Sequence, residues 1–90
     1  MTRSRIVIIG AGIAGASLAF ELLADAEVVV LEMEPMPGQH ATGRSAALFS
    51  ETYGGPLVRK LSRAGRPFLL EPPVGFAAHP LLHPRGVMYI

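Results

Sequence analysis

The sequence predicts an α/β fold that begins with a strand–helix–strand unit. Residues 5–9 form a β-branched run typical of a strand buried on both faces, and residues 27–31 form a second such run. Between these runs, apolar residues recur at helical spacing from Ile13 to about Ala24. The whole unit fits into about thirty residues, the size of a βαβ unit. We therefore expect a right-handed crossover and parallel strands.

Composition excludes several classes of protein. Ninety residues, half of them hydrophobic, make at most one small domain. Eight Lys and Arg residues balance seven Asp and Glu residues without forming a basic stripe, so no nucleic-acid partner is expected. The absence of cysteine excludes disulfides and thiolate metal sites, and the three histidines are too far apart to predict a metal centre.

The amino terminus has some features of a targeting segment. Arg3 and Arg5 precede an uncharged run over 6–20, and residues 24–26 fit a small-x-small cleavage site. The run is shorter than the roughly 20 apolar residues that span a membrane, and it contains three glycines. We expect no signal peptide and no membrane span. The expected location is cytoplasmic, with peripheral membrane association of the complete protein as an alternative.

The rest of the chain alternates between loops and short elements. Residues 33–43 are predicted to form a loop, because two prolines and two glycines exclude a regular element. A short helix over 44–48 is predicted with Ser45 as its cap, and a longer helix begins at Pro56. Pro67 is expected to end or kink that helix. Residues 86–90 are predicted to be a strand, and an open apolar edge there indicates a piece of a larger protein.

A phosphate-binding fingerprint follows the first predicted strand. The run Gly10-Ala11-Gly12-Ile13-Ala14-Gly15 has the G-x-G-x-x-G spacing. The first glycine allows a tight turn, the second admits a pyrophosphate close to the backbone, and the third lets helix and strand pack closely. The helix that follows points its N–H groups and positive dipole end at the phosphate.

An acidic residue completes this fingerprint. Glu32 ends the second predicted strand, about 20 residues after the glycines, where a carboxylate binds a ribose 2′-hydroxyl and repels a 2′-phosphate. The sequence therefore predicts an incomplete Rossmann-like fold that binds an adenine dinucleotide other than NADP. In the alternative interpretation, the glycines serve only the turn and the packing, and Glu32 is a solvated strand end.

The segment after Glu32 resembles that of one family. Its Gly- and hydroxyl-rich loop is similar to that of FAD-dependent oxidoreductases of the glycine oxidase and D-amino-acid oxidase family, most of all the D-arginine dehydrogenase type. The resemblance covers essentially the whole chain and is carried by residues 10–15, 28–32, 42–47, 53–54, 72–73, 75–76 and 79–82. The alternative, an NAD-dependent dehydrogenase, would continue with another short helix and strand.

The resemblance implies that FAD contacts the glycine-rich turn, the strand-end acid and the loop. These residues are Gly10, Gly12, Ala14, Gly15, Glu32, Met33, Ala41, Thr42, Gly43, Arg44, Ser45, Ala46, Ala47 and Leu48. The loop offers hydroxyls and unobstructed N–H groups of the kind that phosphate or flavin oxygens require. Arg44 is expected either to neutralise a phosphate or to pair with Glu34 or Glu51.

The resemblance also implies a substrate class. D-amino acids or related amines are oxidised in this family by hydride transfer to the flavin, which gives imino acids that hydrolyse to oxo acids. Tyr53 matches a tyrosine that lines the substrate pocket. Leu48 and Val87 stand where the D-arginine type has a histidine and a glutamate, so we expect an apolar substrate side chain. No catalytic residue and no group for the substrate carboxylate is assigned.

Residues 1–90 are accordingly expected to be the N-terminal part of an FAD-binding oxidoreductase domain, without the rest of that domain and the substrate domain. Such a part is expected to be inactive alone. The third alternative is a non-catalytic remnant that binds a nucleotide or nothing.

Overall fold

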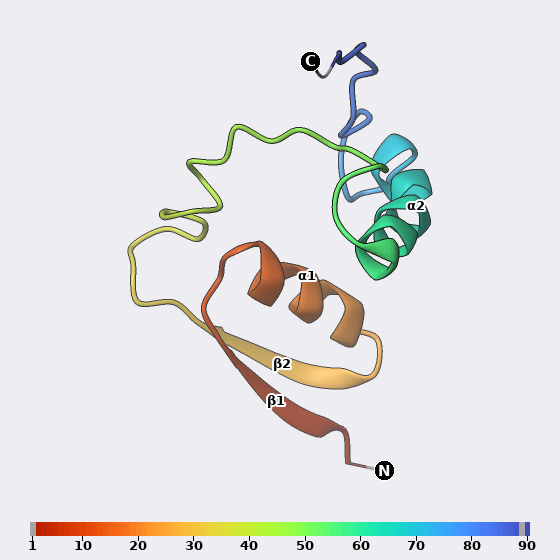
Figure 1. Ribbon diagram of the computed structural model, residues 1–90. Coiled ribbons are helices and arrows are strands. Elements are labelled where there is room, and N and C mark those ends of the chain that lie inside the picture. The colour runs from red at the N-terminus through yellow and green to blue at the C-terminus, as the bar shows by residue number, and fades with distance from the viewer. Residues whose placement is uncertain (1, 89) are drawn as a thin grey trace. The chain divides into compact units, whose positions relative to one another are not determined.

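The computed structural model describes residues 2–88 and 90, in a chain that divides into two compact units, Met1–Ala46 and Ala47–Ile90. Strand β1 (Ser4–Ile9), helix α1 (Ile13–Leu22) and strand β2 (Ala26–Leu31) make up the first unit, and helix α2 (Pro56–Leu70) belongs to the second (Figure 1). The α/β class and the strand–helix–strand start of the chain are confirmed.

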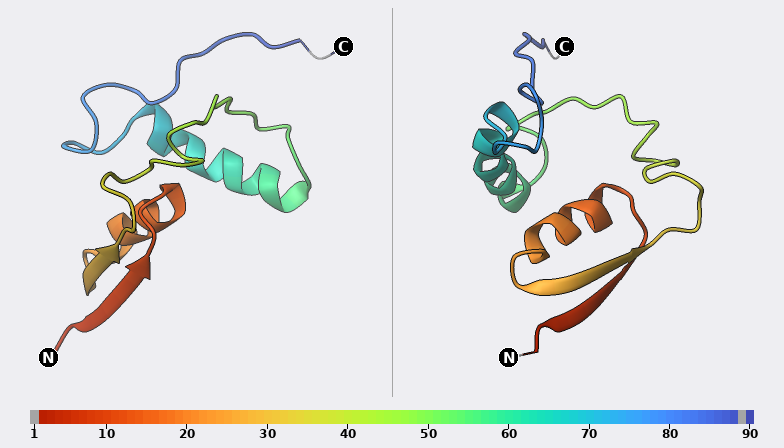
Figure 2. Two further views of the ribbon diagram at one scale, coloured as in Figure 1. Left: turned by 90° about the vertical axis from the view of Figure 1, so that its left-hand side faces the viewer. Right: turned by 180° about the vertical axis from the view of Figure 1, so that it is seen from behind.

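The two strands of the first unit pair in parallel. Their register runs from Ser4 opposite Ala26 to Ile9 opposite Leu31. Parallel strands need a connection that returns along the sheet, and α1 supplies it by crossing one face of the two strands (Figures 1 and 2). Ile8 and Ala26 are buried in this unit, with 8% and 5% of their surface exposed.

The opposite face of the same sheet is apolar and exposed in the described part of the chain. Side chains alternate along a strand, so Val7 and Ile9 lie on the face opposite Ile8. Their exposed fractions are 54% and 87%. The sequence predicted that β1 is buried on both faces. Within the described residues, only the face that carries Ile8 is buried.

Helix α2 organises the second unit. Pro56 stands in its first turn, after Gly55 in extended conformation, as predicted. Pro67 does not end the helix, which continues to Leu70; its ring removes the one N–H that would otherwise donate to the carbonyl oxygen of Arg63. Phe68 packs edge-to-face on Phe76 with ring centroids 4.9 Å apart.

Two predicted elements are not formed. Residues 44–48 are irregular and exposed, so Ser45 caps no helix; a segment this short has no packed face to offset the cost of nucleation. Residues 86–88 and 90 are not a strand, because a strand needs a hydrogen-bonded neighbour and no described segment pairs with them. Tyr89 lies outside the described residues. No described helix combines the length and apolarity needed to cross a bilayer.

Candidate functional site

The glycine-rich turn leaves β1 through a backbone conformation that favours glycine. Gly10 has a φ of 99°, a value that side chains disfavour. Its N–H donates to the carbonyl oxygen of Leu31 at 2.7 Å. This bond continues the parallel pairing of the strands by one step and fixes the point at which the chain turns into α1.

The third glycine of the fingerprint is required by packing. A Cβ atom at Gly15 would overlap the carbonyl oxygen of Gly10 and would press on the side chain of Ile8. The absence of a side chain therefore lets α1 approach the end of β1 closely. This confirms in geometry the packing role that the spacing assigned to Gly15.

The first turn of α1 presents unpaired N–H groups. The helical ladder begins with the N–H of Ala16, which donates to Gly12 O at 2.9 Å. The N–H of Ile13 donates to Thr42 Oγ1 at 3.0 Å. Within residues 2–88 and 90, the N–H groups of Gly12, Ala14 and Gly15 have no acceptor. Such a set of donors at the positive end of a helix matches the chemistry of a phosphate.

The hydroxyl of Thr42 lies over the second glycine. A Cβ atom built on Gly12 would be 3.1 Å from Thr42 Oγ1, so Gly12 leaves room for this contact. Thr42 therefore caps α1 from 29 residues away. The sequence placed Thr42 in the cofactor loop but did not reveal this contact, because nothing in the sequence pairs residue 42 with residue 13.

Glu32 holds two loops together through its carboxylate. Oε2 accepts the N–H of Ala11 at 2.7 Å and Oε1 accepts the N–H of Glu34 at 3.0 Å. The hydrogen bond from Glu34, followed by that from Ala11, lowers the pKa of the Glu32 carboxyl below its usual value. A carboxylate oxygen can accept more than one hydrogen bond, so each oxygen retains capacity for a ribose hydroxyl.

The loop after β2 folds against the glycine-rich turn. The N–H of Gly38 donates to Ala11 O at 3.0 Å, and Gly38 has a φ of 67°. His40 Nε2 lies 2.9 Å from Glu34 Oε1. A Cβ atom at Gly43 would overlap Gly38 O. These contacts bring Glu32, Thr42 and the glycine-rich turn into one site within the first unit.

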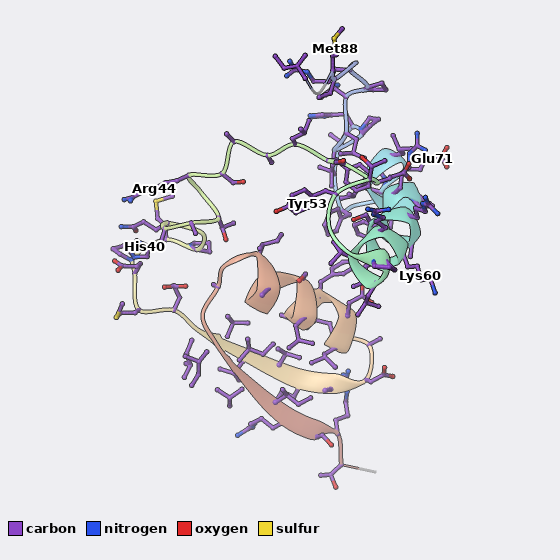
Figure 3. The ribbon with its side chains drawn as sticks, viewed as in Figure 1. His40, Arg44, Tyr53, Lys60, Glu71 and Met88 are labelled. Carbon is purple, nitrogen blue, oxygen red and sulfur yellow. The ribbon has the colours of Figure 1, made fainter. Side chains whose placement is uncertain are left out.

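Arg44 does not form either of the ion pairs considered from the sequence. Glu34 pairs with His40, and Glu51 pairs with Arg66 at 3.7 Å. Figure 3 shows Arg44 and His40 on the same bend of the loop. In the described chain, the Arg44 guanidinium has no ion-pair partner, which leaves its charge available to an anion.

The predicted site residues fall into both units. Those from Gly10 to Ala46 belong to the first unit, whereas Ala47, Leu48 and Tyr53 belong to the second. The side chain of Tyr53 is 76% exposed and projects away from α2 (Figure 3). It does not line the groove described next.

The second unit contains an open groove of about 480 Å³. It brings together Leu48 and Val87, the two positions that the sequence singled out for substrate selectivity. Its wall also includes the paired Glu51 and Arg66, and it is completed by Ala47, Phe49, Leu70, Leu81, Leu82, His83, Pro84 and Arg85. Sequence analysis did not associate Arg66 or Arg85 with this site, because they lie 19 residues apart in sequence and share no motif.

The chain matches the model of a known protein family. A family model described as DAO, FAD dependent oxidoreductase, matches residues 5–90. The matched range includes the glycine-rich turn, Glu32, the loop that follows and the groove.

Replacing Thr42 with valine is expected to uncap α1. Thr42→Val keeps the size of the side chain but removes the acceptor of the Ile13 N–H, so amide hydrogen exchange at Ile13 should accelerate and the first unit should lose about 1 kcal/mol. Thr42→Ser keeps the hydroxyl and should therefore leave both the amide exchange at Ile13 and the stability of the first unit unchanged. Ser17→Ala, which removes a hydroxyl bonded to Ala14 O in the same helix, is the control. Unchanged exchange at Ile13 in Thr42→Val would contradict the cap.

The carboxylate of Glu32 is expected to make stability depend on pH in the acid range. Because its pKa in the folded chain lies below the ordinary 4.5, the unfolded chain binds the proton first as the pH falls. The contribution of Glu32 is therefore complete above about pH 4.5 and is lost as the pH falls through the folded pKa.

Denaturant unfolding of the wild type and Glu32→Gln at a series of pH values checks this dependence. The stability difference between them should shrink as the solution is acidified. Glu21→Gln, which removes a carboxylate from the exposed surface of α1, is the matched control. A difference that stays constant with pH would refute the assignment.

Proposed function

The chain belongs to the FAD dependent oxidoreductase family DAO, whose cofactor is FAD, and from this premise we propose that it forms the FAD-binding part of an enzyme that oxidises D-amino acids or related amines. The nicotinamide alternative is set aside, since the family match covers the loop after β2 as well as the fingerprint.

The donors of the first unit fit the adenine half of FAD. We assign the pyrophosphate to the free N–H groups of Gly12, Ala14 and Gly15, and the ribose to the remaining lone pairs of Glu32. Arg44 supplies a positive charge that has no ion-pair partner in the described part of the chain. The proposed contacts continue through Gly10, Met33, Ala41, Thr42, Gly43, Ser45, Ala46, Ala47 and Leu48.

FAD, when bound, supplies the two-electron acceptor for oxidation of the substrate Cα–N bond. The residues of this chain position the cofactor and the substrate and do not themselves react. The glycine-rich turn places backbone N–H groups at the phosphate, the Glu32 carboxylate fixes the ribose, and the groove holds the substrate side chain.

The groove is the observation that supports an amino acid with an apolar side chain. Its volume of about 480 Å³ lies in the range of small-molecule sites, roughly 300–1,000 Å³. Leu48 and Val87 contribute aliphatic surface to it. A guanidinium or ammonium group placed against this surface would gain no carboxylate from Val87, and Glu51 in the same groove already pairs with Arg66. Tyr53 is proposed to contact substrate from outside the groove.

The exposed apolar face of the sheet supports the proposal that this chain is part of a larger domain. Val7 and Ile9 present aliphatic surface to solvent in the described chain, and burial of such surface is the main favourable contribution to folding. We propose that residues 1–90 are the N-terminal part of an FAD-binding domain whose other segments cover this face.

Bulk at the second glycine is expected to block the dinucleotide. Gly12→Val places a side chain where the pyrophosphate approaches the backbone, and ADP and FAD should bind at least about tenfold more weakly. Gly65→Val is the matched control, because a Cβ atom at Gly65 meets nothing within 4 Å. Calorimetric titration with ADP and the flavin absorbance retained after gel filtration measure the effect. Equal binding by both variants would overturn the assignment.

The substrate preference is expected to favour apolar D-amino acids. In the enzyme that contains this chain, kcat/KM for D-leucine, D-methionine and D-phenylalanine should exceed that for D-arginine by at least about tenfold. Val87→Glu should raise kcat/KM for D-arginine by restoring a carboxylate. A strong wild-type preference for D-arginine that Val87→Glu leaves unaltered would show that the cation is bound elsewhere.

A further inference from the structure

The loop after β2 is attached at both of its ends to residues of the dinucleotide site. At its start, the N–H of Glu34 donates to Glu32 Oε1 at 3.0 Å. Near its end, Thr42 Oγ1 accepts the N–H of Ile13 in the first turn of α1. His40 stands two residues before Thr42, and its Nε2 atom lies 2.9 Å from Glu34 Oε1. The pair of His40 and Glu34 therefore joins the start of the loop to its end.

The strength of this pair depends on the charge of the imidazole. A neutral imidazole donates from Nε2 in only one of its two tautomers, whereas an imidazolium always donates and forms a charge-assisted hydrogen bond with a carboxylate. A histidine ordinarily changes between the two forms between about pH 5 and 8. The side chains of His40 and Glu34 are 63% and 25% exposed, so the ion pair is of the modest strength that solvent allows.

The charged groups that contact His40 or act on it in the described chain are Glu34, Glu32 and Arg44. The pKa of the Glu32 carboxyl is lowered first by the hydrogen bonds from Glu34 and Ala11, and the positive charge of His40 adds to this effect. The N–H of Arg44 donates to His40 O at 3.1 Å, and the two side chains lie on the same bend of the loop (Figure 3). A proton on His40 therefore acts on both carboxylates at the start of the loop.

We propose that His40 is a positioning residue for FAD, whose imidazolium holds Glu34 so that the Glu34 N–H stays on Glu32 and the loop stays against the start of α1. This inference rests on the proposed function and deepens it, because it makes cofactor binding dependent on pH. The contacts assigned to the ribose and the pyrophosphate both depend on this loop. The protein therefore binds FAD more tightly when His40 is protonated.

The pH dependence of binding measures this effect. FAD and ADP-ribose are titrated into the purified protein by calorimetry from about pH 8.5 to about pH 5.5. The phosphates of both probes keep a constant charge over this range, and Glu32 stays ionised because its pKa lies below the ordinary 4.5. The wild type should bind both probes roughly two- to fivefold more tightly at the acid end. The change should follow the titration of the His40 ring, observed by NMR.

Four variants separate the charge of His40 from its hydrogen bond. His40→Gln keeps a neutral donor, so its affinity should stay at the value of the wild type near pH 8.5 at every pH. His40→Lys remains charged over the whole range and should stay near the value at the acid end. Glu34→Gln removes the partner carboxylate but keeps the backbone N–H, and should also abolish the pH dependence. His79→Gln removes an exposed imidazole of the second unit and should match the wild type.

Two results would refute the positioning role. A pH dependence that persists in His40→Gln would show that another group titrates, and one that persists in Glu34→Gln would show that His40 acts on the ligand directly.

Hydrogen exchange at the Glu34 N–H, measured without ligand, gives a readout that does not depend on FAD. Its protection, relative to the intrinsic rate at the same pH, should be greater near pH 5.5 than near pH 8.5 in the wild type and constant in His40→Gln. Equal protection at both pH values in the wild type would exclude the inference. If neither probe binds at any pH while the protection follows His40, the positioning of the loop stands and the proposed FAD binding fails. If FAD binds without any dependence on His40, the proposed function stands and this inference fails.

Discussion

The N–H groups at the start of α1 determine the arrangement of the first unit. The first turn of any α-helix leaves such groups without a helical acceptor, and the chain satisfies them from a distance. Thr42 accepts a hydrogen bond from the N–H of Ile13, and Glu32 accepts one from the N–H of Ala11 just before the helix. The groups that remain are clustered and share one electrostatic sign. The position of the loop and the exposed cluster of N–H groups therefore have one origin, since the loop caps part of the helix terminus and leaves the rest open.

The second unit is held together differently. Its contacts are the edge-to-face pair of Phe68 and Phe76, the hydrogen bond from the N–H of Leu81 to Leu69 O at 2.8 Å, and the ion pair of Glu51 and Arg66. They attach the segments before and after α2 to its carboxyl half and leave a groove between them. The groove is lined by side chains that are distant in sequence, so Leu48 and Val87, near the two ends of this unit, lie along the same groove.

Local patterns account for what the sequence predicted correctly. β-Branched runs and glycine spacing act within a few residues, so β1, α1 and β2 were located, although α1 ends at Leu22 rather than Ala24. The predicted short helix over 44–48 and the predicted strand over 86–90 are not formed in the described residues, because each requires a neighbouring segment to pack or pair with. The two contacts of Glu32 and the cap by Thr42 were not predicted, because a carboxylate or hydroxyl gives no sign in the sequence of which distant N–H it meets. The proximity of Arg85 to Leu48 was invisible for the same reason.

The contact between Thr42 and Ile13 also joins two residues that are synthesised at different times. The ribosome adds about 5–20 residues per second, and 29 residues separate the N–H group from its acceptor. The terminus of α1 is therefore made roughly one and a half to six seconds before Thr42 exists. Strand β2 ends at Leu31, so synthesis of the strand–helix–strand unit is complete eleven residues before Thr42 is added. Completion of the cap therefore follows the synthesis of the unit that it stabilises.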